Sequence, residues 1–155
     1  MKIILLTGII GFTVGCSNGQ KPTENKTPEA VTSAFSKKYP DVKKVDWEDE
    51  GKTFEAAFTM NKIEYSAVFD SNGNFKEEES EIKASELPKA VTEYCAKTYA
   101  DHKLSEAAKI INEAGVVTYE AELSKDKMHF DVIFDASGNF ISKGEAVSEE
   151  PEDED

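Results

Sequence analysis

Two short segments of the chain gather oxygen-bearing side chains around a glycine. They are FDSNGNF, at residues 69–75, and FDASGNF, at residues 134–140. Asp and Asn oxygens can bind calcium, and the same residue types form tight turns because their side chains accept hydrogen bonds from nearby backbone N–H groups. The segments therefore allow two hypotheses, a cation-binding loop used twice or a hairpin turn used twice.

The spacing within these segments favours the turn. A calcium loop of the EF-hand type needs glycine at its sixth position and a bidentate Glu at its twelfth. Counted from the Asp, glycine is fourth in both segments, and the twelfth residue is acidic only in the first, as Glu81. We therefore predict three-residue hairpin loops at residues 71–73 and 136–138, each with glycine at positive φ.

The chain contains two histidines, His102 and His129. His129 and Asp131 alternate along a predicted strand beside Glu120 and Glu122, so a His–carboxylate metal site is one hypothesis for that face. A solvated polar sheet face accounts for the same residues, and we favour it, with no metal. Because no Ser–His–Asp or Cys–His spacing is typical of nucleophilic catalysis, we expect a protein that is not an enzyme and has no cofactor.

The charge of the chain limits its partners. It has 18 basic residues against 31 acidic ones, a net charge of −13, and every basic residue is lysine. Such a surface repels nucleic acid, and without arginine it lacks the planar fork that binds phosphate bidentately. We expect no nucleic-acid partner and no phosphorylated ligand.

The chain begins with the pattern of an export signal, MKIILLTGIIGFTVGC. One lysine precedes an apolar run that is too short for a permanent membrane span, so residues 1–15 are predicted to be a removable signal peptide. TVGC resembles the lipobox of bacterial lipoproteins, with Thr13 in place of the usual Leu. We predict a lipid on Cys16, membrane contact through that anchor alone, and a position in the cell envelope facing the periplasm or the cell surface. A plain secretory signal is the alternative.

The termini and the second cysteine follow from composition. Residues 16–26 are predicted to be the lipidated Cys and a flexible tether, and residues 148–155, SEEPEDED, an acidic disordered tail. With Cys16 acylated, Cys95 has no intramolecular disulfide partner. We interpret Cys95 as a small buried hydrophobe rather than a reactive thiol.

The remainder of the chain shows an internal duplication. A shift of sixty residues aligns 27–39 with 87–99, with six identities in thirteen, and a shift of sixty-five aligns 53–75 with 118–140, with nine in twenty-three. The predicted units are therefore residues 27–82 and 83–147.

Each unit is predicted to contain one amphipathic helix followed by strands. Apolar residues recur at helical spacing in its first segment and alternate with period two afterwards. Two-residue turns at 61–62 and 126–127 would pair all the apolar positions on one face. Turns at 50–51 and 114–115 would place Trp47 beside Phe54 and Ile110 beside Tyr119. The predicted fold class is α+β, a tandem repeat of one helix plus a four-stranded antiparallel meander, with the helices packed on one face of the sheet.

The tandem unit, the VDWEDEG stretch, the YSAVFDSNGNF and FDVIFDASGNF hairpins and the lipobox together resemble the PepSY-like, β-lactamase-inhibitor-like proteins of the bacterial envelope. This resemblance covers nearly the whole predicted domain. It implies a fold like that of the β-lactamase inhibitory protein, and a noncatalytic module that binds or inhibits proteins through its sheet.

The outward sheet face is the candidate site. One hypothesis is a docking surface for a protein or peptide, with acids steering a cationic partner and apolar side chains making contact. Other hypotheses are an ordinary solvated face, a small-ligand or cation-binding envelope protein, and an enzyme. The candidate protein-binding residues are Glu55, Glu64, Val68, Glu120, Glu122, His129, Asp131 and Ile133.

Overall fold

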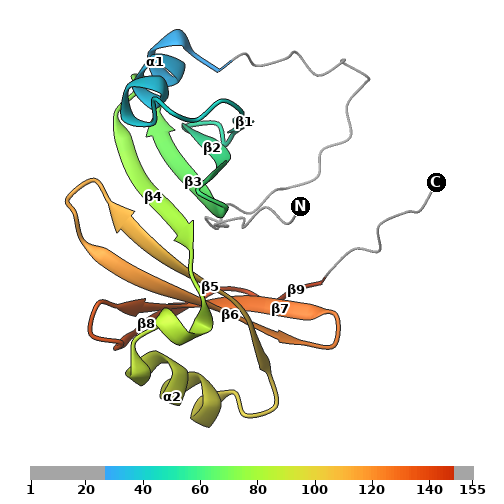
Figure 1. Ribbon diagram of the computed structural model, residues 1–155. Coiled ribbons are helices and arrows are strands. Elements are labelled where there is room, and N and C mark those ends of the chain that lie inside the picture. The colour runs from blue at the N-terminus through green and yellow to red at the C-terminus, as the bar shows by residue number, and fades with distance from the viewer. Residues whose placement is uncertain (1–26, 149–155) are drawn as a thin grey trace, which may run out of the picture.

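A computed structural model of the chain describes residues 27–148 (Figure 1). The predictions for residues 1–26, including Cys16, and for residues 149–155 lie outside the described residues. No helix of the described part is long and apolar enough to cross a membrane. The helices are α1 (Glu29–Lys38), the short 3-10 helix η1 (Ala84–Glu86) and α2 (Lys89–Thr98). The strands are β1 (Asp46–Asp49), β2 (Thr53–Met60), β3 (Ile63–Asp70), β4 (Phe75–Glu81), β5 (Lys103–Asn112), β6 (Val117–Lys125), β7 (Met128–Asp135), β8 (Phe140–Lys143) and β9 (Val147–Ser148).

All nine strands belong to one antiparallel sheet. The order runs from β1 to β8, and β9 pairs with β7. The predicted fold class, a tandem repeat of one helix plus a four-stranded meander, is therefore wrong. The reason lies at β4, whose Glu77–Glu81 pairs with Ala108–Asn112 of β5. A strand that ended a separate meander would leave a row of backbone donors and acceptors unpaired, and β5 satisfies them.

The two predicted hairpin registers are confirmed. Asn61 and Lys62 have φ of 55° and 67°, as a two-residue turn of the primed type requires, and they join β2 to β3. In β2 and β3 the pairing runs from Met60 with Ile63 to Phe54 with Phe69. The β6–β7 hairpin has the same arrangement, with Lys125 opposite Met128, Leu123 opposite Phe130, Ala121 opposite Val132 and Tyr119 opposite Phe134.

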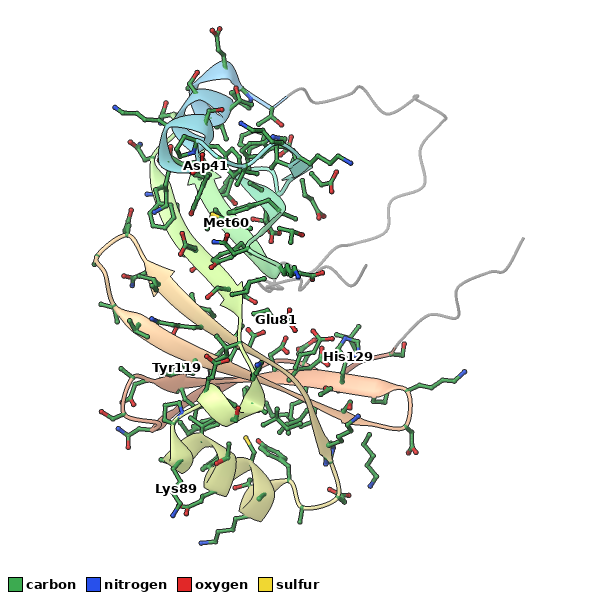
Figure 2. The ribbon with its side chains drawn as sticks, in the orientation of Figure 1. Asp41, Met60, Glu81, Lys89, Tyr119 and His129 are labelled. Atoms are coloured by element: carbon green, nitrogen blue, oxygen red, sulfur yellow. The ribbon has the colours of Figure 1, made fainter. Side chains whose placement is uncertain are left out.

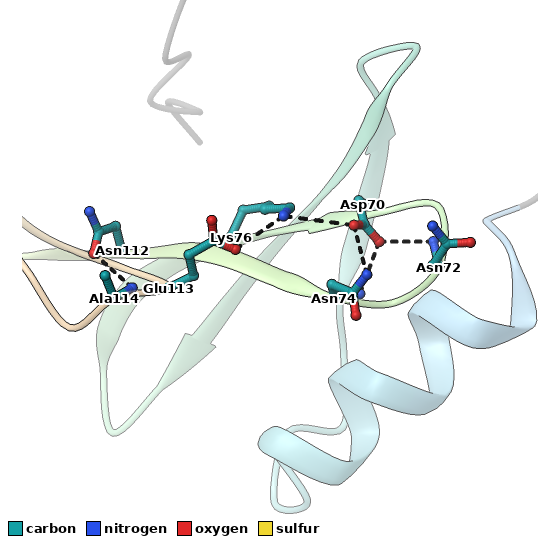
Figure 3. Close-up of polar contacts among 7 residues, drawn as sticks. All are labelled: Asp70, Asn72, Asn74, Lys76, Asn112, Glu113 and Ala114. Carbon is teal, nitrogen blue, oxygen red and sulfur yellow. Dashed lines mark hydrogen bonds and ion pairs between the residues drawn. The ribbon is translucent and has the colours of Figure 1, made fainter.

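The predicted neighbours of the earlier strands are wrong. Trp47 pairs with Ala56, and Ile110 pairs with Thr118. The β5–β6 turn is one residue longer than predicted because the Asn112 side chain accepts hydrogen bonds from the backbone N–H of Ala114, drawn in Figure 3, and of Val116. A one-residue change moves a side chain to the other face, so Ile110 lies opposite the face covered by the helices.

The Asp–Asn segments form three-residue hairpin loops, as predicted. Oδ1 of Asp70 accepts hydrogen bonds from the backbone N–H of Asn72, at 2.9 Å, and of Asn74, at 3.0 Å (Figure 3). Its other oxygen accepts one from the Asn74 side chain. These bonds, the Asn74 side chain first, lower the pKa of Asp70, and Asp135 has the equivalent partners. The carboxylates are therefore used in building the turns.

Both helices pack on the same face of the sheet, over two clusters of buried side chains. α1 places Val31 and Phe35 over Phe69, and α2 places Val91 and Cys95 over apolar residues of β5, β6 and β7. Each fully buried aromatic or aliphatic side chain contributes about 1.5–3 kcal/mol. Cys95 is buried and forms no disulfide within residues 27–148, in agreement with its interpretation as a small hydrophobe.

The sheet bends between its two halves. Figure 1 shows α1 and α2 on the outer sides of the molecule, with β4 connecting the upper and lower strands. The helix-free surfaces of the two halves consequently turn towards each other. This bend brings together side chains that are far apart in the sequence.

The loops after β3 and β7 also lie against the helices. Gly73 has φ of +82°, and a Cβ there would approach the carbonyl oxygen of Ala30 in α1 to 2.5 Å. Gly138 has φ of +84°, and its Cβ would lie 2.8 Å from that of Ala90 in α2. Glycine is required at both positions for the turn and for the close approach of the helix.

We expect Gly73→Ala to destabilise the protein more than Gly51→Ala. Gly51 has φ of +85°, and no atom lies within 4 Å of the place that a Cβ would take, so alanine there costs only the left-handed backbone strain, about 1–2 kcal/mol. At Gly73 the clash with α1 adds about 1–3 kcal/mol. Urea unfolding of both variants measures the difference, and equal losses of stability would show that the helix contact is unimportant.

Candidate functional site

The helix-free face of the sheet carries acidic side chains from one half to the other. We call this surface the acidic face. Strand alternation and pairing place its residues opposite the helices, and Figure 2 shows His129 on one side of the lower strands and Lys89 of α2 on the other. Its acids are Asp46, Glu48, Glu55, Glu64, Glu77, Glu79, Glu81, Glu106, Glu120, Glu122 and Asp131.

The structure places all eight predicted candidate residues on this face, in very different environments. Glu64 is exposed, whereas Glu55 is 5% exposed and Glu120 is 3% exposed. Glu122 accepts a hydrogen bond from the Ser105 hydroxyl at 2.6 Å. Half-buried side chains complete the set, namely Val68, His129, Asp131 and Ile133. The face is thus partly desolvated, which the alternation of the sequence does not reveal.

Sequence reasoning missed Glu79, which lies near the centre of the acidic face. It belongs to β4, where it pairs with Ser66 on one side and with Ile110 on the other, and it is 6% exposed. The sequence shows a run of acids in this strand, FKEEESE, as expected for a solvated edge. Only the β4–β5 pairing makes Glu79 a central residue.

Glu79 and Glu120 stand on either side of β5. Glu79 pairs with Ile110 of β5, and Glu120 pairs with Ala108, the next residue of β5 on the same face. Oε1 of Glu79 and Oε2 of Glu120 are buried and have no hydrogen-bond partner within residues 27–148.

Burial shifts the acid–base equilibria of this face. It raises the pKa of Glu79 to about 8, with the charge of Glu55 as the next cause. It also raises the pKa of Glu120 to about 9, with the charge of Glu79 next. Desolvation is again the main reason that the pKa values of Glu55, Glu77 and Asp131 lie above their ordinary value. Both effects disfavour the ionised form, and at Glu79 and Glu120 they move the pKa above neutral pH.

Lysine side chains do not neutralise the centre of the face. Ion pairs within the described range of the chain join Lys38 with Glu78, Lys76 with Asp70 and Glu113, Lys89 with Glu93, and Lys125 with Asp101. None of them includes Glu55, Glu79 or Glu120. These three carboxyl groups therefore lack a counter-charge from residues 27–148.

A groove of about 600 Å³ opens on the first half of the acidic face. Its floor includes Glu55 and Glu79, and the loop between α1 and β1 contributes Lys43 and Lys44. Apolar side chains from the same loop and from β2 also line it. The groove gives an approach to Glu79 from solvent, although this side chain is largely buried.

The metal hypothesis gains no support from the geometry. Across residues 27–148, no group of three or more His, Cys, Asp and Glu side chains is arranged to hold a metal ion. His129 pairs with Ser124 and Val147, and its buried Nδ1 has no partner within the same range. The other histidine, His102, contacts Asp101 in the loop after α2, away from the acidic face.

We expect the stability of the protein to depend on pH through Glu79 and Glu120. Both pKa values are raised in the folded state, so the stabilisation is complete below the unfolded value near 4.5 and is lost as pH rises through about 8 to 9. The double variant Glu79→Gln/Glu120→Gln keeps the neutral form at every pH. Its melting temperature should therefore fall less than that of the wild type between about pH 5 and pH 9.

The matched control is Glu29→Gln/Glu93→Gln, which removes the same charge from the exposed surfaces of the two helices. Its melting temperature should follow the wild-type slope. Parallel slopes for all three proteins would contradict protonation of the buried pair.

Comparison with known proteins gives a family and a fold. No curated protein matches the chain. A family model described as "Putative beta-lactamase-inhibitor-like, PepSY-like" matches residues 52–142. This range contains the acidic face from β2 to β7, apart from the acids of β1.

Several solved structures from Bacteroides species share the fold. A putative periplasmic protein from Bacteroides eggerthii has a TM-score of 0.70 at 17% identity, covering 79% of this chain and 90% of its own. A DUF2874 family protein from Bacteroides uniformis has a TM-score of 0.68 at 20% identity, and the match covers 75% of this chain and 87% of that protein. A BLIP-like protein from Bacteroides fragilis has a TM-score of 0.62 at 21% identity, and the match covers 82% of this chain and 92% of that protein. At these identities the likeness concerns the fold alone.

Proposed function

Because this chain belongs to the PepSY-like, putative beta-lactamase-inhibitor-like family, we propose that it is a noncatalytic module that binds a cationic protein or peptide through its acidic face. The observation that carries the proposal is the centre of that face, where buried carboxyl groups have no counter-charge among residues 27–148. When ionised, such groups are costly to hold in a folded protein unless a partner supplies the opposite charge.

The distribution of charge supports a protein partner. Exposed acids such as Glu48 and Glu64 surround the buried ones and would attract a cationic surface from a distance. The half-buried Val68 and Ile133 lie on the same face and offer apolar contact. A polar rim around a partly desolvated centre is the usual anatomy of a protein interface.

The proposed location is the cell envelope, with Cys16 as the lipid-bearing residue. The N-terminal signal pattern supports export, and the related structure from Bacteroides eggerthii carries the description periplasmic. The BLIP-like description of the Bacteroides fragilis structure supports an inhibitory role as one form of this binding. A lipid anchor would hold the module at the membrane surface and leave the acidic face free for a partner.

Photocrosslinking in cells tests the proposed surface. A photoreactive phenylalanine at Val68 or Ile133 should give a defined crosslinked protein, whereas the same group at Glu93, on the exposed side of α2, should not. Changing Glu64 and Glu122 to Gln should lower the yield severalfold because two negative charges that steer a cationic partner are lost. The control Glu29→Gln/Glu93→Gln should leave it unchanged.

Two results would refute this proposal. One is equal crosslinking from α2 and from the acidic face. The other is a yield that is insensitive to Glu64 and Glu122 while the proteins remain folded.

The lipid anchor makes a separate prediction. Cells fed a radiolabelled fatty acid should label the wild-type protein, and Cys16→Ser should abolish the label and release the protein from the membrane fraction. Cys95→Ser serves as the control, because Cys95 is buried and should not be acylated. Labelling that persists in Cys16→Ser would place the lipid on another residue, and absence of label from the wild type would exclude a lipid anchor.

A further inference from the structure

We propose that Glu79 and Glu120 form a receptor for one cationic side chain of the partner, an arginine guanidinium or a lysine ammonium, which replaces a proton held by the two carboxyl groups. This inference rests on the proposed function, because it assigns the group of the partner that anchors it within the acidic face. It also predicts that binding depends on pH.

The position of the pair suits such a receptor. Glu79 of β4 and Glu120 of β6 lie on either side of β5, where Glu79 pairs with Ile110 and Glu120 pairs with Ala108, two residues along the same face. They are 6% and 3% exposed, and each has one buried oxygen without a partner in the described range. Two carboxylates with one unpartnered oxygen each offer two acceptors to a single guanidinium, whose N–H groups donate in a fixed planar fork.

A route from solvent leads to Glu79, the first member of this pair. Glu79 lines the groove on the first half of the acidic face, together with Glu55 and Ala57. A long cationic side chain can enter there with its head group directed at Glu79, and Glu120 stands on the other side of β5. Lysine and arginine are suited to this path because their alkyl stems pack on apolar surface while the charged head reaches an acceptor.

The surroundings of the pair favour an organic cation over a metal ion. Ala108 and Ile110 lie between the two acids, and Ile133 pairs with Glu120. These apolar side chains can contact an alkyl stem but cannot coordinate a metal. A calcium ion takes six to eight oxygen ligands, and residues 27–148 contain no cluster arranged for a metal.

The charges around the pair fix the direction of the pH effect. In the free protein the carboxyl groups hold a proton, and a cation binds well only when that proton leaves for solvent. Neighbouring acids oppose ionisation, whereas a bound cation favours it, so affinity should rise with pH by up to about tenfold per unit for one displaced proton. The titratable groups facing the pair are Glu55 on β2, Glu77 on β4, Glu106 on β5, Glu122 on β6 and Asp131 on β7, and His129 acts on Asp131 from the same strand.

The experiment uses the purified full-length chain and a capped peptide, acetyl-Gly-Ala-Arg-Ala-Gly-amide. Backbone ¹H–¹⁵N NMR titrations would report binding, with the largest shift changes expected at the amides of Ala108 and Ile110. The dissociation constant should fall by at least about tenfold between pH 6 and pH 8. The citrulline analogue, which has nearly the same shape without the charge, should not bind.

The variant Glu79→Gln/Glu120→Gln should weaken arginine-peptide binding at pH 8 by at least about tenfold and remove its pH dependence. It should fold, because Gln closely resembles a protonated Glu in size and shape. The control Glu29→Gln/Glu93→Gln removes the same net charge from the helices and should bind within about twofold of the wild type, since an exposed charge contributes little to a distant contact.

Three results would overturn this receptor. They are absence of peptide binding to the wild type at millimolar concentration, equal binding to Glu79→Gln/Glu120→Gln, and an affinity that does not rise with pH. If spermidine shifted the same amides and the peptide did not, the ligand of the pair would be a free polyamine and not a peptide side chain. In each case crosslinking from Val68 or Ile133 would still decide separately whether the acidic face binds a protein.

Discussion

The pairing of β4 with β5 is the constraint on which the remaining structure depends. It joins the two hairpin systems into one sheet, places both helices on the same face, and makes Glu79 a central residue instead of an edge residue. Its physical basis is the requirement that backbone N–H and C=O groups find partners. Because the sheet bends at this junction, the opposite face collects acids from both halves.

The acidic face combines two properties that usually exclude each other. Carboxyl groups lie on it in large number, yet those at its centre are buried, so they are stable as neutral acids and become unfavourable when ionised. The partner proposed for this surface brings a cationic group on an apolar alkyl stem. This combination connects the fold to the proposed binding of a cationic partner.

Short-range features were predictable because local chemistry decides them. Asn61–Lys62 turns the chain in two residues, and Asp70 forms its loop through hydrogen bonds to backbone groups within four residues. Predictions failed where one residue of loop length or a distant strand decided the outcome. Asn112 extends its turn and moves Ile110 to the other face. The residues of β4 do not indicate which strand pairs with it.

The sequence by itself determined the helices, the hairpin registers and the side of each strand that carries acids, since alternation and turn chemistry act between near neighbours. Only the tertiary structure decided that the strands form one sheet and that Glu55, Glu79 and Glu120 are desolvated. Burial depends on what other strands place around a side chain. An acid in an alternating strand has the same local pattern whether it faces water or the centre of a bent sheet.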